Sequence, residues 1–285
     1  MTTTPPRSGR PRVRLTRRGR LVLALTVAAL AAAVLLPLLT TGGTEEERPA
    51  PEPVRTLVIP EGWRAGQVYA AVDTALGQQP GTTRAAATTA RLPLPGDAAG
   101  NPEGYLFPAT YPLDEGTTPA GLLAYMVETA NRRLGSGALA ADARSGGLST
   151  YEAVRIASIA QAEAATASDM GKVARVVRNR LDAGMPLQMD STLNYALDRS
   201  TLDTTAEDTR IDSPYNTYAR RGLPPTPIGN PGEEAMRAAV DPPEGDWLYF
   251  VTVGPGDTRF TADYTEHQRN VADFNARRAT ERSGR

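Results

Sequence analysis

Apolar side chains recur every three to four residues along several stretches of the chain, and this spacing predicts amphipathic helices. Runs rich in branched and aromatic residues predict strands, one opening residues 54–63 and another over residues 247–253. Residues 101–113 hold aromatic and apolar residues between prolines, which favours an ordered, extended segment. The predicted helices cover residues 65–76, 120–134, 150–165, 232–240 and 265–278, with a further helix from Ser168 to a C-cap at Gly184.

The third predicted helix has the clearest start and one unexpected residue. Ser149 and Glu152 stand three positions apart, as in a capping box. Spacings of seven and four residues place Glu163 on the same helix face as Ile156 and Ile159. The pattern therefore predicts a carboxylate set into an apolar surface.

Three segments lack a regular period. Residues 77–101 are dominated by Thr, Ala, Pro and Gly, and the pattern places no element there. Residues 184–197 are predicted to form a loop. Residues 212–232 are so dense in Pro, Gly, Asn and Tyr that they are too rigid for a linker and too interrupted for regular structure. We expect this last segment to form a shaped wall or rim.

The start of the chain predicts a membrane anchor. Residues 1–20 carry seven arginines and predict a disordered basic tail, and residues 21–41 open with 19 uncharged residues. A helix needs ~20 such residues to cross a bilayer, whereas the apolar region of a cleaved signal peptide, the alternative, is only ~7–15 residues long. Arginines before the span and glutamates after it predict a cytoplasmic tail and an extracytoplasmic remainder. Residues 42–54 predict a Pro- and Glu-rich linker.

Composition removes several classes of chemistry. The 285 residues carry a formal net charge of −1, so no global field attracts nucleic acid. The chain has no cysteine, which excludes disulfides and thiolate nucleophiles. Its single histidine is His267 and its single lysine is Lys172, both interpreted as surface residues. Carboxylates are the acid/base groups left in quantity, and we expect neither a cofactor nor a metal.

The surroundings predicted for Glu163 suit a proton donor. Burial against isoleucines disfavours the ionised carboxylate and raises its pKa. A carboxyl group that is protonated near neutral pH can act as the general acid of glycosidic cleavage. The alternative is an ordinary salt bridge from Glu163 to Arg175 or Arg180, since structural ion pairs also perturb pKa values.

Five sequence blocks resemble a known family in both order and spacing. These blocks are GYLFPATY, ASIAQAEA, VRNRLDAGMPLQMDST, DSPYNTYARRGLPPTPIGNPG and WLYFV. Over about residues 55–275 the chain resembles the membrane-anchored endolytic murein transglycosylases, bacterial lyases that cleave peptidoglycan. The resemblance implies an α+β protein with a single N-terminal span, a LysM-like module (55–112), a connecting helix and loop (113–148) and a catalytic domain (149–278).

The resemblance also assigns a catalytic residue. The family has one essential glutamate in an A-S-I-x-x-x-E element, which here is Ala157, Ser158, Ile159 and Glu163. Many members carry a second acid two residues before this glutamate, where this chain has Gln161. Glu163 is then the only carboxylate that the element supplies.

A second departure affects the LFPDTY segment of the family. The aspartate often found there is Ala109 in this chain, so that position cannot be essential here. The LysM-like part is the weakest match to the family pattern.

Further candidates for substrate binding lie outside that element. We expect the loop and the 212–232 segment to offer hydrogen bonds and flat aromatic surfaces to sugars, or else to use these side chains to stiffen the loop. Arg180 could hold a carboxylate or cap an ion pair in the core, and Glu103 could line the cleft or cap a turn. The candidates are Gln188, Asp190, Tyr215, Asn216, Tyr218, Glu103 and Arg180.

The resemblance implies cleavage of the β-1,4 bond between N-acetylmuramic acid and N-acetylglucosamine in nascent strands, with 1,6-anhydro ends that terminate elongation. It also implies work beside peptidoglycan synthases in the cell membrane. Two alternatives stay open: a non-catalytic anchor that binds the wall, and a lyase that uses pyridoxal phosphate bound to Lys172.

Overall fold

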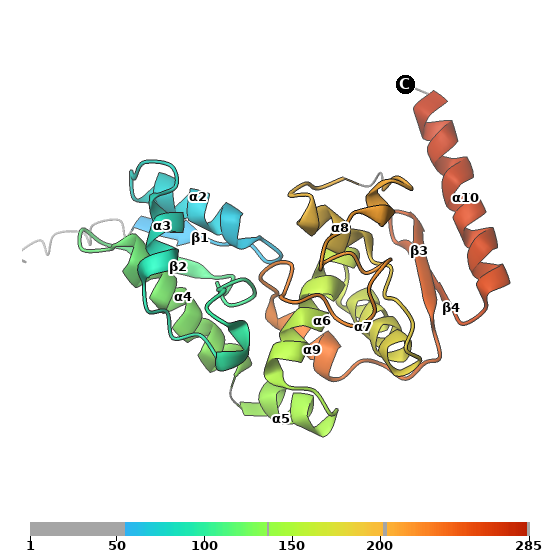
Figure 1. The fold of residues 1–285 in the computed structure, drawn as a ribbon, viewed down its shortest axis with the longest axis horizontal. Helices are drawn as coiled ribbons and strands as arrows, with labels where there is room; N and C mark the ends of the chain where they lie inside the picture. Colours follow the sequence, from blue (N-terminus) through green and yellow to red (C-terminus); the bar gives the residue numbers. More distant parts are fainter. Residues whose placement is uncertain (1–54, 136, 202–203, 284–285) are drawn as a thin grey trace, which may run out of the picture. The chain divides into compact units, whose positions relative to one another are not determined.

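Helices and two short strand pairs form the α+β structure of the chain (Figure 1). The computed structural model describes residues 55–135, 137–201 and 204–283. The predicted basic tail, membrane span and linker lie outside these described residues. Within them, no helix combines the length and apolar character needed to cross a bilayer.

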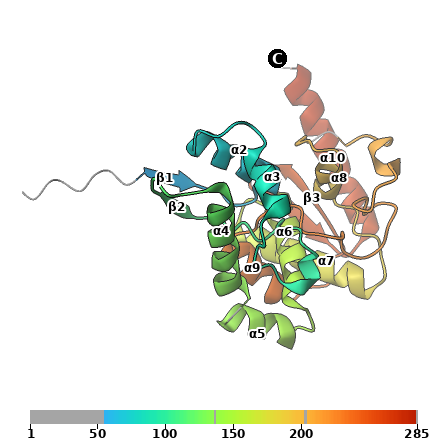
Figure 2. The ribbon, with the colours of Figure 1, turned by 60° about the vertical axis from the view of Figure 1, so that its left-hand side comes forward.

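The N-terminal part, residues 55–134, is built around two antiparallel strands. Leu57 pairs with Tyr111 in this ribbon, and both side chains are buried. The helices pack in sequence, α3 against α2 and α4 against α3, as Figure 2 shows from the side. The elements are β1 (Arg55–Val58), α2 (Ala65–Ala75), α3 (Thr82–Thr89), a 3₁₀ turn (Gly96–Ala98), β2 (Thr110–Leu113) and α4 (Pro119–Leu134).

The C-terminal part, residues 137–283, is organised around α6. This helix packs against α5, α7, α8 and α9, while α10 packs against the β3–β4 hairpin. The elements are α5 (Gly137–Ser145), α6 (Thr150–Glu163), α7 (Ala167–Asp182), α8 (Asp190–Ala196), a 3₁₀ turn (Asp208–Arg210), α9 (Glu233–Val240), β3 (Tyr249–Gly254), β4 (Asp257–Thr261) and α10 (Tyr264–Ser283).

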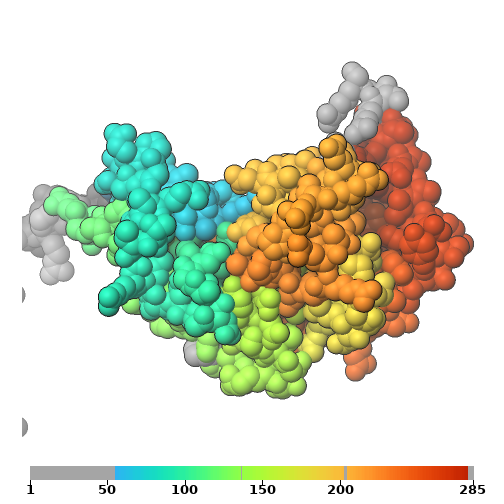
Figure 3. Space-filling model, viewed as in Figure 1, coloured from blue at the N-terminus to red at the C-terminus, as the bar shows by residue number. Residues whose placement is uncertain are grey.

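The 212–232 segment lies against α6 and also contacts the N-terminal part. Three polar side chains on one face of α6 hold it: Arg155 donates to the Pro224 carbonyl, while Ser158 and Gln161 accept from the amides of Ile228 and Gly232. In the space-filling view this segment (orange) covers the middle of the face shown (Figure 3). The prediction that it forms a shaped wall agrees with this placement.

Asn230 joins this segment to the N-terminal part. Its side chain is fully buried. Its amide oxygen accepts from the Leu106 amide at 2.8 Å, and its amide nitrogen donates to the Trp63 carbonyl at 2.8 Å. Its backbone adds bonds to Gly62 and Trp63. The GNPG sequence is therefore a point where the two parts of the chain are bonded together.

All six predicted helices are present, with ends within a few residues of those expected, except that α10 extends five residues further than the predicted end at 278. Ser149 and Glu152 form the predicted capping box. The loop prediction for residues 184–197 is wrong in part, because α8 occupies residues 190–196. Helices α3 and α5 and strand β4 were not predicted.

Candidate active site

Glu163 is the last residue of α6. The chain turns to an extended conformation at Ala164, directly after it. The helix buries Ile156 and Ile159 completely, and Glu163 itself is half-buried. The predicted apolar stripe is therefore present, and it delivers a carboxylate to the end of the central helix.

The carboxylate of Glu163 meets the first turn of α8. The backbone amide of Ser191 donates a hydrogen bond to its Oε1 at 3.1 Å. The Ser191 hydroxyl is buried beside the carboxylate without a hydrogen bond of good geometry to any described group. The hydroxyl therefore lies close enough to act on the Glu163 carboxylate.

Desolvation raises the pKa of Glu163 above its ordinary value. The amide and hydroxyl of Ser191 oppose this rise, and the negative charge of Asp190 adds to it. Since the net direction is upward, the structure favours a carboxyl group that holds its proton at higher pH than a solvated glutamate does.

The alternative interpretation of Glu163 as part of an ordinary salt bridge is wrong. Arg175 donates instead to the carbonyls of Pro242 and Pro243. Arg180 donates to the carbonyls of Leu248, Pro186 and Leu187 and to Oε1 of Gln188. Among the described residues, no basic side chain forms an ion pair with Glu163.

These contacts also describe Arg180 and Gln188. Arg180 is buried, and its guanidinium lies over the Tyr249 ring at 5.2 Å. Its hydrogen-bond partners among the described residues are carbonyl oxygens and the Gln188 amide, not a carboxylate. Gln188 is exposed and has a left-handed backbone (φ 53°). Arg180 therefore fixes the loop that presents Gln188.

Two other candidates lie together beside Glu163. The Tyr218 hydroxyl donates to Oδ1 of Asp190 at 2.5 Å, joining the 212–232 segment to α8. Desolvation and this bond raise the pKa of the Tyr218 phenol, and the negative charge of Glu163 adds to the rise. Glu163, Asp190 and Tyr218 thus form one cluster built from three separate segments.

Asn216 and Tyr215 hold the loop in shape. Asn216 is fully buried, donates to the carbonyls of Thr209 and Ile211, and accepts from the amides of Tyr218 and Ala219. Tyr215 packs on the Tyr195 ring, with centroids 4.9 Å apart, and its hydroxyl bonds that of Thr226. The side-chain contacts of both residues stiffen the loop that presents Tyr218.

Glu103 lies between the two parts of the chain and contacts α8, the helix that carries Asp190. Its side chain is 3% exposed. Its carboxylate accepts from the Ala65 amide at the start of α2, at 2.9 Å, and from the Tyr195 hydroxyl at 3.0 Å. Burial raises the pKa of Glu103 to about 7, against the effect of these bonds and of Arg64. Glu103 therefore caps the start of α2, whereas the predicted cap was of a turn.

Sequence reasoning missed three residues of this region. Ser191 binds Glu163 through its backbone, which no side-chain pattern reveals. Tyr195 and Asn230 were not singled out, because their partners are more than 90 residues away in the sequence. The one available signal was the density of Asn and Tyr in these segments.

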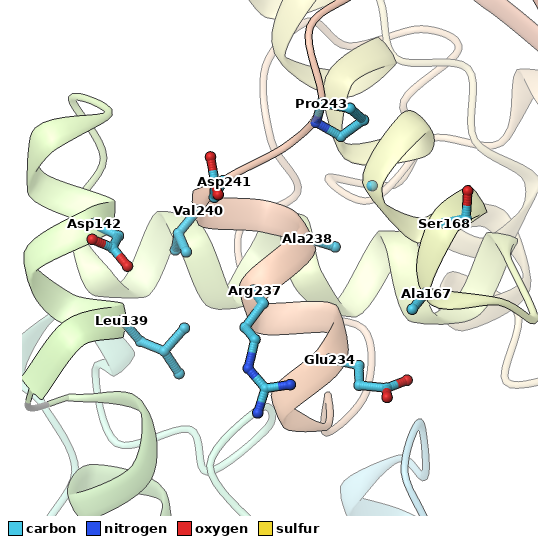
Figure 4. A pocket seen from close by; sticks show the side chains of 11 residues that line it. Leu139, Asp142, Ala167, Ser168, Glu234, Arg237, Ala238, Val240, Asp241 and Pro243 are labelled. Carbon is cyan, nitrogen blue, oxygen red and sulfur yellow. The ribbon is translucent and has the colours of Figure 1, made fainter.

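A cavity of about 510 Å³ lies elsewhere, between α5, α7 and α9 (Figure 4). Asp142, Glu234, Asp241 and Arg237 are among its lining residues, and Glu163 is not. Arg237 is paired with Glu233. The described ranges contain no group of three or more acidic or histidine side chains placed to hold a metal ion.

Known proteins are similar to this chain in sequence and in fold. An endolytic murein transglycosylase of Bacillus subtilis is 37% identical over 168 residues, 59% of this chain and 46% of the relative. One from Streptococcus pneumoniae is 33% identical over 267 residues, 84% of this chain and 48% of the relative. The chain thus spans about half the length of the curated relatives it matches.

The fold comparison agrees. The crystal structure of a YceG-like protein from Listeria monocytogenes is similar to this chain, with a TM-score of 0.66 at 29% identity. The match covers 76% of this chain and 75% of that one. In sequence, residues 28–273 match the YceG-like family. The chain therefore belongs to the YceG-like family.

Proposed function

We propose that this protein is an endolytic lytic transglycosylase that cleaves the β-1,4 bond between N-acetylmuramic acid and N-acetylglucosamine in peptidoglycan. The observation that carries the proposal is Glu163, a desolvated carboxyl group at the end of the central helix with an upward pKa and no ion-pair partner among the described residues. The names of its curated relatives support the same activity.

The reaction needs only one protein carboxyl group. Glu163 donates its proton to the glycosidic oxygen as the bond from that oxygen to the muramyl C1 breaks. The muramyl C6 hydroxyl attacks C1 and gives its proton to the Glu163 carboxylate, which restores the acid. No water is consumed, and the product carries a 1,6-anhydro end. Because the nucleophile belongs to the substrate, the second catalytic carboxylate of ordinary glycosidases is not required.

Location and partners complete the proposal. The span at residues 21–41 would anchor the protein in the cell membrane, with the short tail in the cytoplasm and the rest outside. In that place the enzyme would cut nascent strands and end their elongation beside the peptidoglycan synthases. Residues 55–112 would act as the LysM-like module, and the bonds of Leu106 and Trp63 to Asn230 support a fixed position beside the active domain.

The second candidate is a protein that binds the wall without cleaving it. The well-specified cluster around Glu163 argues against this candidate, because wall binding does not require a desolvated acid. The pyridoxal-phosphate alternative depends on Lys172, which lies over the Phe260 ring at 5.1 Å and near Asp169.

The test is cleavage of purified sacculi by the full chain in detergent, with products identified by mass spectrometry. We expect anhydro-muramyl products, and we expect Glu163→Gln to abolish them. Glu128→Gln, the same change at an exposed position of α4, is the matched control and should leave the yield unchanged. Reducing-end products would indicate hydrolysis and contradict the intramolecular step. Loss of activity in Lys172→Ala, with Glu163→Gln active, would favour the pyridoxal-phosphate lyase.

A further inference from the structure

The first turn of α8 bonds one carboxyl group and carries a second. The Ser191 amide donates to Glu163, and the preceding residue, Asp190, accepts from the Tyr218 hydroxyl. Since Asp190 and Ser191 are adjacent, the same turn fixes both carboxyl groups. Asp190 is 27 residues from Glu163 in the sequence, so the fold brings to the site a second acid that the A-S-I-x-x-x-E element lacks.

The charged groups around this pair are few. Asp190 faces Glu163 from α8, and Tyr218 faces it from the 212–232 segment. The positive charge of Arg180, in α7, lowers the pKa of Tyr218. The Arg180 guanidinium donates its hydrogen bonds to carbonyl oxygens and to Gln188. Within the described part of the chain, neither Asp190 nor Glu163 has an ion-pair partner. Two neighbouring carboxyl groups without a cation do not readily carry two negative charges.

The hydrogen bonds indicate which group carries the charge. A phenol that donates to a carboxylate stabilises its ionised form, and Asp190 has this bond. Glu163 is desolvated and accepts one backbone amide at the longer distance of 3.1 Å. Paired acids in unlike surroundings take unlike protonation states.

We propose that Asp190, held by Tyr218, is a fixed negative charge beside Glu163 that adds to desolvation in keeping the proton on Glu163 until a glycosidic oxygen arrives. This inference rests on the proposed function, in which Glu163 is the proton donor. Asp190 and Tyr218 are then positioning residues that act through Glu163. Asp190 is no second nucleophile, because the muramyl hydroxyl fills that role.

The direct test measures the proton on Glu163 rather than catalysis. The full chain in detergent is labelled with ¹³C at the glutamate side-chain carboxyl and titrated by NMR. The Glu163 signal is identified by its absence from Glu163→Gln. We expect a midpoint above that of solvated glutamate, lowered by about one pH unit in Asp190→Asn. Asparagine can still accept from Tyr218, so the local geometry is kept.

Two further variants separate charge from structure. Asp198→Asn makes the same change just after the other end of α8, where the side chain is fully exposed, and should leave the Glu163 midpoint unchanged. Tyr218→Phe keeps the Asp190 charge and should lower the midpoint by less than Asp190→Asn does. An ordinary midpoint for Glu163 in the parent, or an unchanged one in Asp190→Asn, overturns the inference.

The cleavage assay then gives a distinguishable result. In Asp190→Asn the high-pH limb of the rate profile should move down with the Glu163 midpoint, which costs about tenfold in rate above that limb. A purely structural role would lower the rate at every pH without moving the limb, and this outcome would overturn the inference. Absence of anhydro products from the parent chain would instead refute the proposed function, while the NMR midpoints still decide the charge assignment.

Discussion

The hydroxyl of Tyr195 donates a 3.0 Å hydrogen bond to the carboxylate of Glu103, 92 residues earlier in the chain. The same carboxylate accepts from the Ala65 amide at the start of α2 and from the Asn230 side chain at 3.3 Å. Donors from three segments thus converge on one buried acid. Arg64 reinforces the contact, with its guanidinium 5.3 Å from the Tyr195 ring centroid. The N-terminal part is therefore fixed to α8, the helix that also carries Asp190 and Ser191 of the candidate site.

The burial of Glu103 predicts that the free energy of unfolding depends on pH. Burial raises the pKa of Glu103 to about 7, whereas it is 4.5 for an ordinary glutamate. Its stabilising contribution is complete below the unfolded pKa and is lost as the pH rises through about 7. Glu103→Gln keeps an acceptor and removes the titration. We expect the loss of unfolding free energy between about pH 5 and pH 8 to shrink in this variant, by at most on the order of 3 kcal/mol.

Urea unfolding at the two pH values measures this difference. Glu128→Gln on the exposed face of α4 serves as control and should keep the pH dependence of the parent. If Glu103→Gln and the parent lose the same free energy over this range, Glu103 does not titrate there.

The contacts of Asn230 predict that removing its side-chain amide lowers the free energy of unfolding substantially. Asn230→Ala leaves the Leu106 amide buried without its partner and removes a donor from the Trp63 carbonyl. The Trp63 carbonyl keeps its bond from the Asn230 backbone amide, so the Leu106 amide alone is left unpaired, and we expect a loss of about 1–3 kcal/mol in the free energy of unfolding. Asn131→Ala, which removes one exposed bond to the Pro93 carbonyl, should cost under about 1 kcal/mol. Equal losses in denaturant melts of the two variants would contradict the role assigned to Asn230.

Gly104 allows the GYLFP and PPTP sequences to pack together. Its φ is +86°, and a Cβ there would lie 2.5 Å from Pro227 and 2.9 Å from Val154. Gly222 has a similar φ of +88° but open space around it. Alanine at either position costs about 1–2 kcal/mol for the left-handed backbone. Gly104→Ala should lose a further 1–3 kcal/mol or so through overpacking, seen as a lower melting temperature than that of Gly222→Ala. Similar melting temperatures would show that Pro227 and Val154 can move aside for the added Cβ at little cost.

The helices predicted from sequence are those with long apolar stripes and clear ends. Helix α6 combines a capping box with buried Val154, Ile156 and Ile159, so local and tertiary preferences agree. Helices α3 and α5 were missed because their buried residues are few and small: Thr83 in α3, and Ala140 and Ala143 in α5. With seven residues, α8 is too short to show a period.

The sequence predicted individual side chains of the candidate site but not the contacts between them. Glu163 stands out as an acid on an apolar stripe, and Asp190 and Tyr218 lie in segments expected near the cleft. Their mutual bond and the Ser191 amide depend on how α6, α8 and the 212–232 segment pack, which one sequence does not encode locally. For the same reason Glu103 was predicted only as a cleft or cap residue.

The last prediction concerns Gln161, the position at which the family pattern often has an acid. Its Oε1 accepts from the Gly232 amide at 3.2 Å, and the Glu61 carboxylate lies directly against Gly232. Desolvation raises the pKa of Glu61, and the charges of Glu234 and Glu233 add to the rise. A glutamate at position 161 would place a fourth carboxylate among these three.

We therefore expect Gln161→Glu to lower the free energy of unfolding at neutral pH by about 0.5–1 kcal/mol, and to cost little near pH 4, where carboxyl groups are protonated. Gln268→Glu, the same change on exposed α10, should have no such pH dependence. Since Gln161 acts through Gly232 and not through Glu163, cleavage of sacculi should stay within about twofold of the parent. A large gain in cleavage would instead mean that a carboxyl group at position 161 takes part in the reaction.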